Sequence, residues 1–130
     1  MAVRQLRLVV EVEDFDQAVR FYRDVLGLRE EAAFSNGPGA HGIVLDAGRA
    51  TLELFDAGQK AAVDDLEVGR QVAPRSRVAF EVDDGPGATR RLVAAGASEV
   101  APPTLTPWNS VNARLDTPDG LHVTIFQEQA

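Results

Sequence analysis

The side chains best suited to chemistry in this sequence are charged residues on stretches where polar and apolar residues alternate. Arg7 and Arg77 occupy equivalent points of two such stretches, and Glu53 lies on a third. The arginines can form structural ion pairs with Glu53, Glu11 or Glu81, or they can bind an anionic or carbonyl-bearing ligand. Glu53 could also act in acid–base catalysis. Because guanidinium charge favours an ionised carboxylate, we expect it to lower the pKa of Glu53 and weaken it as a base.

Aromatic and polar side chains in the second half of the sequence are a candidate surface for a planar ligand. Trp108, the only tryptophan, follows a proline-rich stretch and precedes a predicted strand. An indole at the mouth of a strand can stack on a planar molecule, with Asn109, Asn112 and Arg114 as orienting polar groups. The alternative is a tryptophan that plugs the core at a junction within the fold or between subunits.

Phe34 and Phe55 are the corresponding aromatic candidates in the first half of the chain. Both lie on predicted strands, where aromatic side chains more often belong to the core. We therefore treat them as candidate ligand contacts for which a place in the core is the simpler explanation.

Composition excludes several classes of function. The 130 residues include 13 Lys and Arg against 20 Asp and Glu, a net charge of −7, and no basic block, so neither nucleic acid nor a membrane surface is an expected partner. The absence of cysteine excludes disulfides, zinc–thiolate sites and thiol nucleophiles. The serines show no G-x-S-x-G pattern. With no apolar leader and no long apolar stretch, we expect a cytoplasmic protein.

An internal repeat organises the chain. Residues 7–14 align with residues 77–84 at an offset of 70, with identical Arg, Glu, Val and Asp at matching positions. We predict a single domain over residues 1–130, made of a first module at 3–56 and a second module at 76–130. The linker at 57–75 contains a predicted short helix at 59–69, which could cover a cavity or contact a second subunit.

Each module changes its hydrophobic period in the same order, from alternation to helical spacing and back to alternation. The first helix is expected to begin after Asp14 and end at Gly27, with apolar residues from Phe15 to Leu26. The second helix is expected to begin late, near Ala88, because Pro86 lies between two glycines. Strands are predicted at 6–12, 30–34, 42–46 and 50–55, and then at 77–82, 99–101, 111–115 and 121–127. This pattern indicates an α+β fold of two tandem βαβββ modules.

The motifs of both modules resemble the vicinal oxygen chelate superfamily, which includes glyoxalase I, bleomycin-resistance proteins, fosfomycin-resistance transferases and extradiol dioxygenases. The resemblance covers nearly the whole chain. It is carried by residues 13–22, 25–28, 78–84 and 116–126, the last of which includes the turn Thr117-Pro-Asp-Gly. It implies a curved eight-stranded mixed sheet around a cavity, often in a homodimer.

The resemblance also indicates where a metal would be bound. Metal-dependent members use one side chain from each of four strands, and the corresponding positions here are Arg7, Glu53, Arg77 and Thr124. Only Glu53 is a conventional ligand, and two guanidinium groups repel a divalent cation. His122, two residues before Thr124, could reach the cavity, although a half-exposed strand residue is the simpler expectation. We therefore predict no metal and no other cofactor.

Taken together, the sequence favours a metal-independent small-molecule binding protein that resembles the drug-sequestering members of the family. Its expected cargo is an antibiotic or another planar or amphipathic compound, and its expected assembly is a homodimer. The alternative is a lyase, isomerase or dioxygenase that uses Glu53 and His122 with a metal, or Glu53 alone as a base.

Overall fold

The chain forms two βαβββ units in succession, as the alternation predicts. The computed structural model describes residues 2–25, 27–118 and 120–130, so Leu26 of the first predicted helix and residue 119 of the last predicted turn lie outside the described residues. The first unit consists of β1 (Val3–Glu11), α1 (Phe15–Val19) continued by the π-helical turn η1 (Arg20–Val25), β2 (Arg29–Phe34), β3 (Gly42–Ala47) and β4 (Ala50–Phe55). The helix α2 (Ala57–Glu67) follows in the linker. The second unit consists of β5 (Ser76–Val82), α3 (Gly85–Ala94), β6 (Ser98–Leu105), β7 (Ser110–Asp116) and β8 (His122–Glu128).

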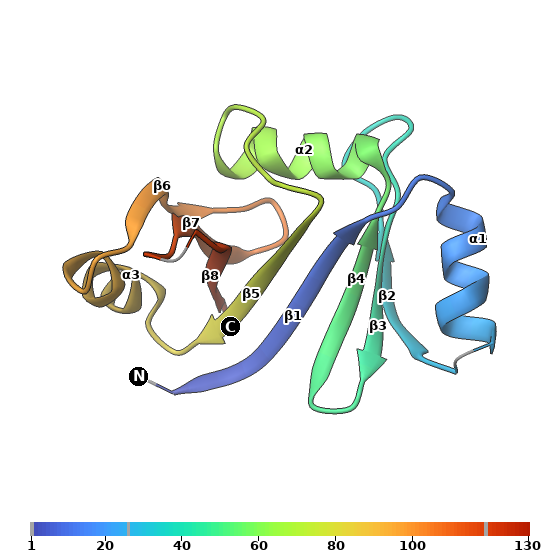
Figure 1. Ribbon diagram of the computed structural model, residues 1–130, viewed down its shortest axis with the longest axis horizontal. Coiled ribbons are helices and arrows are strands. Elements are labelled where there is room, and N and C mark those ends of the chain that lie inside the picture. Colours follow the sequence, from blue (N-terminus) through green and yellow to red (C-terminus); the bar gives the residue numbers. More distant parts are fainter. Residues whose placement is uncertain (1, 26, 119) are drawn as a thin grey trace.

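All eight strands belong to one open sheet in the order β2-β3-β4-β1-β5-β8-β7-β6. The first strands of the two units, β1 and β5, pair antiparallel at the centre, and each pairs parallel with the last strand of its own unit. Figure 1 shows α1 and α3 at opposite ends of the molecule and α2 above the middle of the sheet. The predicted α+β fold with an eight-stranded mixed sheet is therefore confirmed.

Each of the three α-helices begins after an aspartate. The carboxylates of Asp14, Asp56 and Asp84 accept hydrogen bonds from the backbone N–H three residues later, which satisfies a donor that the helix itself cannot. The prediction of a late start for α3 is wrong. The helix begins at Gly85, because a proline in the first helical turn loses no intrahelical hydrogen bond. In the described part of the chain, no helix combines the length and apolarity needed to cross a membrane.

Strand β6 is longer than the alternation predicts, because it continues through Pro102 and Pro103 to Leu105. It lies at the edge of the sheet, where a proline is tolerated because one side of an edge strand has no neighbouring strand to receive a backbone hydrogen bond. The register of its pairing with β7 shifts twice along this stretch.

The described residues form three buried apolar clusters. One lies under the helix of each unit, and a third joins Val63 of α2 to Val9 and Phe55. In the first unit Val19 packs with buried residues of β3 and β4, namely Ile43, Leu45 and Leu54. In the second unit Ala88 of α3 packs with Val82, Leu115, Val123 and Ile125. Because these faces of the strands pack under the helices, the alternate residues of the same strands face the opposite, concave side of the sheet.

Candidate functional site

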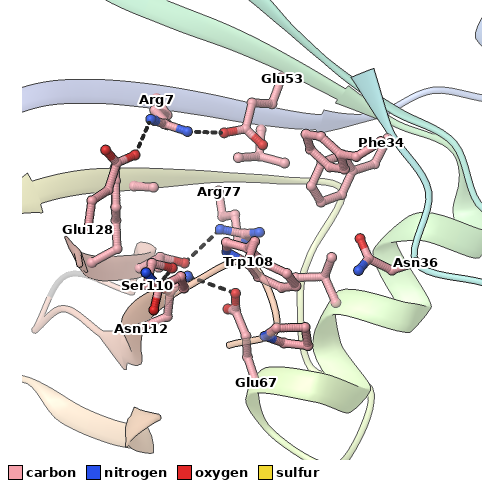
Figure 2. Close-up of a pocket in the computed structure, with 18 of the residues that line it drawn as sticks. Arg7, Phe34, Asn36, Glu53, Glu67, Arg77, Trp108, Ser110, Asn112 and Glu128 are labelled. Carbon is pink, nitrogen blue, oxygen red and sulfur yellow. Dashed lines mark hydrogen bonds and ion pairs between the residues drawn. The ribbon is translucent and has the colours of Figure 1, made fainter. Parts of the chain in front are cut away.

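The concave side of the sheet encloses a cavity of about 520 Å³ (Figure 2). Its walls are formed by the four central strands β4, β1, β5 and β8. The helix α2, the end of β2, and β7 with the segment that leads into it complete the lining. Most of the site residues predicted from the sequence line it, namely Arg7, Phe34, Glu53, Phe55, Arg77, Trp108, Asn109, Asn112 and Thr124. The structure therefore brings together side chains that are more than 100 residues apart in the sequence.

Arg7 is held by several partners on one wall of the cavity. Its guanidinium forms ion pairs with Glu53 at 3.3 Å and Glu128 at 3.1 Å, and its Nε donates a hydrogen bond to Gln5 at 2.9 Å. It also lies 4.8 Å from the centre of the Phe126 ring, within the range of a cation–π contact. Of the carboxylates expected from the sequence, Arg7 pairs with Glu53. These contacts satisfy the charge of Arg7 within the protein.

Glu53 has a raised pKa, which is the opposite of the sequence prediction. Its side chain is buried, and burial raises the pKa of a carboxylate because the charged form loses its hydration. The charges of Arg7 and Arg77 lower the pKa of Glu53, but they do not outweigh this effect. The prediction failed because it counted the neighbouring charges and had no measure of burial.

Arg77 is as buried as Glu53, but its hydrogen-bond partner among the described residues is uncharged. It is 7% exposed, and within the described chain its guanidinium makes one hydrogen bond, from Nη1 to the Thr124 hydroxyl at 2.6 Å. No carboxylate among the described residues forms an ion pair with it. Burial, and then the charge of Arg114, lowers the pKa of Arg77, although a guanidinium stays protonated at neutral pH. Arg77 therefore presents a positive charge to the cavity without a carboxylate partner.

Aromatic rings form another part of the cavity wall. Phe34 and Phe55 contact each other edge to face, with ring centres 6.0 Å apart. Gly42 makes this contact possible, because a Cβ atom there would lie 2.8 Å from the Phe34 ring. Trp108 lines the cavity and is 41% exposed, so it is not a core plug within this chain. An exposed indole on a cavity wall is available for contact with a flat molecule.

Two predicted site residues, Arg114 and His122, do not line the cavity. Arg114 is 0% exposed, and its guanidinium binds Glu67 at 2.7 Å and Asp64 at 2.9 Å, both from α2. Because these carboxylates of α2 bind the guanidinium, Arg114 does not reach the cavity. The geometry therefore does not support the prediction that Arg114 orients a ligand. His122 is buried as well, not half-exposed, because its ring lies between Arg114 at 3.2 Å and Asp116 at 3.0 Å. Burial, opposed by the contact with Asp116, lowers the pKa of His122.

Sequence analysis missed the residues that α2 supplies to the cavity, Val63 and Glu67. Glu67 is buried and accepts hydrogen bonds from Asn112 at 2.8 Å and from Arg114 at 2.7 Å. A signal was available, since Gln59, Val63 and Glu67 recur every fourth residue on a helix that the sequence predicted. This spacing places them on one face, and the structure shows that all three are buried.

Comparison with known families agrees with this geometry. The model of the Glyoxalase/Bleomycin resistance protein/Dioxygenase superfamily matches residues 4–125. The chain belongs to this superfamily. The resemblance stated from the sequence motifs is thereby confirmed. No curated protein matches the sequence.

Solved structures with the superfamily fold include proteins of different description. A hypothetical protein from Bacillus halodurans C-125 has a TM-score of 0.70 at 14% identity, covering 99% of this chain and 95% of the other. Methylmalonyl-CoA epimerase from Mycobacterium tuberculosis has a TM-score of 0.67 at 19% identity, covering 98% and 88%. The Streptomyces coelicolor methylmalonyl-CoA epimerase bound to 2-nitronate-propionyl-CoA has a TM-score of 0.66 at 18% identity, covering 98% and 97%. At these identities the likeness shows the fold alone.

The superfamily positions assigned to metal ligands do not fit a divalent cation in this chain. The four side chains are those of Arg7, Glu53, Arg77 and Thr124, and all of them line the cavity. Two are cations, and the hydroxyl of Thr124 and the carboxylate of Glu53 are both already engaged by arginine. Among the described residues, no cluster of three or more His, Cys, Asp or Glu side chains is arranged to hold a metal. A single carboxylate falls short of the three protein ligands that catalytic zinc sites usually have.

Proposed function

We propose that this protein binds a small molecule in its cavity without a metal ion, and that the ligand is a planar or amphipathic compound such as an antibiotic that the protein sequesters. The observation that carries the proposal is the composition of the cavity wall. An exposed indole and a pair of phenylalanine rings share one cavity with a buried guanidinium that forms no ion pair with a carboxylate of the described residues. Apolar walls with a few convergent polar groups are typical of small-molecule sites.

The proposal is tested by titration of a panel of planar aromatic compounds, followed by the emission of Trp108 and by calorimetry. Since Trp108 is the only tryptophan, a change in its emission reports on this cavity directly. Trp108→Leu is expected to weaken binding about two- to tenfold, the size of an aromatic contact beyond its buried area. Phe21→Leu is the control, because Phe21 is exposed and does not line the cavity. If no compound of a varied panel changes the emission or releases heat, the proposal is wrong.

Metal independence has its own test. Elemental analysis of protein purified without chelators is expected to find no stoichiometric divalent ion, because the four positions that would bind it carry two guanidinium groups. An ion that is present in equal amount to the protein, and is lost in Glu53→Gln, would contradict this.

A second candidate function is proton transfer by Glu53, and its raised pKa is the observation that favours it. A carboxyl group whose pKa moves toward neutrality is better matched to acid–base catalysis than an ordinary glutamate. The epimerases that share this fold suggest methylmalonyl-CoA as a first substrate to try. In D₂O, catalysis would exchange the proton at the carbon between the carbonyl groups for deuterium, and Glu53→Gln would abolish the exchange. Absence of exchange above the background rate removes this candidate for that substrate.

A further inference from the structure

The internal repeat places two different side chains at equivalent points of the cavity wall. In the first unit Val9 of β1 pairs with Glu53 of β4, and in the second unit Ala79 of β5 pairs with Thr124 of β8. Val9 and Ala79 are related by the same offset of 70 that relates Arg7 to Arg77. Thr124 therefore stands where the repeat would place the counterpart of Glu53.

This difference decides how the two arginines are neutralised. Arg7 has the carboxylates of Glu53 and Glu128 within 3.3 Å. Among the described residues, Arg77 has the neutral hydroxyl of Thr124 as its hydrogen-bond partner and no carboxylate in ion-pair contact. The two buried carboxylates that line the same cavity are engaged elsewhere, since Glu53 is bound by Arg7, and Glu67 is bound by Arg114 and Asn112.

We propose that Arg77 and Thr124 form a subsite for a carboxylate group of the ligand. The ligand carboxylate would pair with Arg77 as the carboxylate of Glu53 pairs with Arg7. This inference rests on the proposed function, because it names the class of molecule that the cavity binds. A guanidinium recognises a carboxylate through parallel hydrogen bonds, and the Thr124 hydroxyl adds a further polar contact at the same point. Figure 2 shows Arg77 and Trp108 pointing into the same cavity, so one molecule can present its carboxylate to Arg77 and its flat body to the indole.

The carboxylates of the cavity wall limit the negative charge that a ligand can carry. Besides Arg7 and Arg77, the lining includes the carboxylates of Glu53, Glu67 and Glu128. A doubly charged phosphate would meet repulsion from these groups. One carboxylate instead balances Arg77, the lining arginine to which the described residues supply no ion pair. The ligand class is therefore a planar aromatic compound with one carboxylate.

The test compares two probes of the same shape, 2-naphthoate and the uncharged 2-naphthamide, by calorimetry at pH 7.5. The parent protein is expected to bind naphthoate about ten- to a hundredfold more tightly, the range for a hydrogen bond to a charged group. In Arg77→Met this preference is expected to disappear while naphthamide binding persists. Thr124→Glu is expected to have the same effect, because it supplies Arg77 with an internal carboxylate. Arg4→Met is the control and should keep the preference, since Arg4 is exposed, pairs with Asp83 and lies outside the cavity.

The outcomes separate this inference from the proposed function. Equal binding of the two probes by the parent, or a preference that survives in Arg77→Met, overturns the carboxylate subsite and leaves the cavity as a binding site. If neither probe binds, the proposed function fails for planar aromatic carboxylates. The subsite is then tested separately by titration with acetate. A shift of the Arg77 side-chain ¹⁵N resonance on adding acetate, without a shift for Arg4, supports the subsite, and no shift overturns it.

Discussion

Arg77 and Arg114 are both buried arginines of the second unit, yet they bind different partners. Arg114 on β7 binds Asp64 and Glu67 and does not line the cavity. Arg77 on β5 lines the cavity and binds one hydroxyl. Burial alone therefore does not separate a structural arginine from a candidate ligand-binding one. Their binding partners separate the two roles, because an arginine that is already ion-paired within the protein is not available to bind an anionic ligand.

The largest expected effect is the loss of stability in Arg114→Met. Removing this guanidinium leaves two buried carboxylates without their cation, which typically costs about 3–5 kcal/mol. Arg77→Met removes a buried charge that has no ion pair, so its stability should stay within about 1 kcal/mol of the parent or exceed it. Urea unfolding of both variants measures the difference. Equal losses would show that Arg77 is structural as well.

A smaller loss is expected in Glu67→Gln. This change removes one of the two carboxylates bound to Arg114 and keeps a side chain of the same shape, so we expect a loss of about 1–3 kcal/mol. Asp65→Asn is the matched control, because Asp65 is the exposed acidic residue of the same helix. Its free energy of unfolding should match the parent, and a loss as large as that of Glu67→Gln would mean that the helix responds to charge in general.

Glu53→Gln should change stability with pH in a defined direction. The folded protein raises the pKa of Glu53 above its usual 4.5, so its contribution to stability is fully present below that value and is lost as pH rises through the folded pKa. Glutamine does not titrate, and the variant should therefore gain stability relative to the parent between pH 4 and pH 8. Free energies of unfolding across this range test the sign. A relative loss with rising pH would show that Arg7 and Arg77 outweigh the effect of burial.

The smallest effect concerns His122, which lies next to Arg114. Its pKa is lowered from 6.5, so its contribution is present above that value and is lost as pH falls through the folded pKa. The loss cannot exceed about 1.4 kcal/mol per pH unit for one proton. Unfolding curves from pH 7 to pH 5 should show this decline in the parent and in His41→Asn, and a smaller decline in His122→Asn. Equal declines in all three would exclude His122 as its source.

The sequence predicted which strand residues face the cavity more reliably than it predicted the partners of their side chains. Alternation placed Arg7, Glu53, Arg77 and Thr124 on one face because the period of a strand is fixed by its backbone. Strand alternation could not show that Arg114 would bind carboxylates of α2, because alternation gives the face of the sheet and not the conformation of a long side chain. The pKa of Glu53 depended on burial, which no local pattern contains. The homodimer, the cytoplasmic location and the antibiotic cargo stay predictions.

The position of α2 has a consequence for how the chain folds. The carboxylates that neutralise Arg114 in the described structure come from the linker, before the second repeat begins. A fragment with residues 76–130 alone would lack both carboxylates that neutralise Arg114. The polar interior of the second unit is therefore completed by residues that lie outside the repeated sequence. During synthesis α2 leaves the ribosome before the second unit, so its carboxylates are already present when Arg114 emerges.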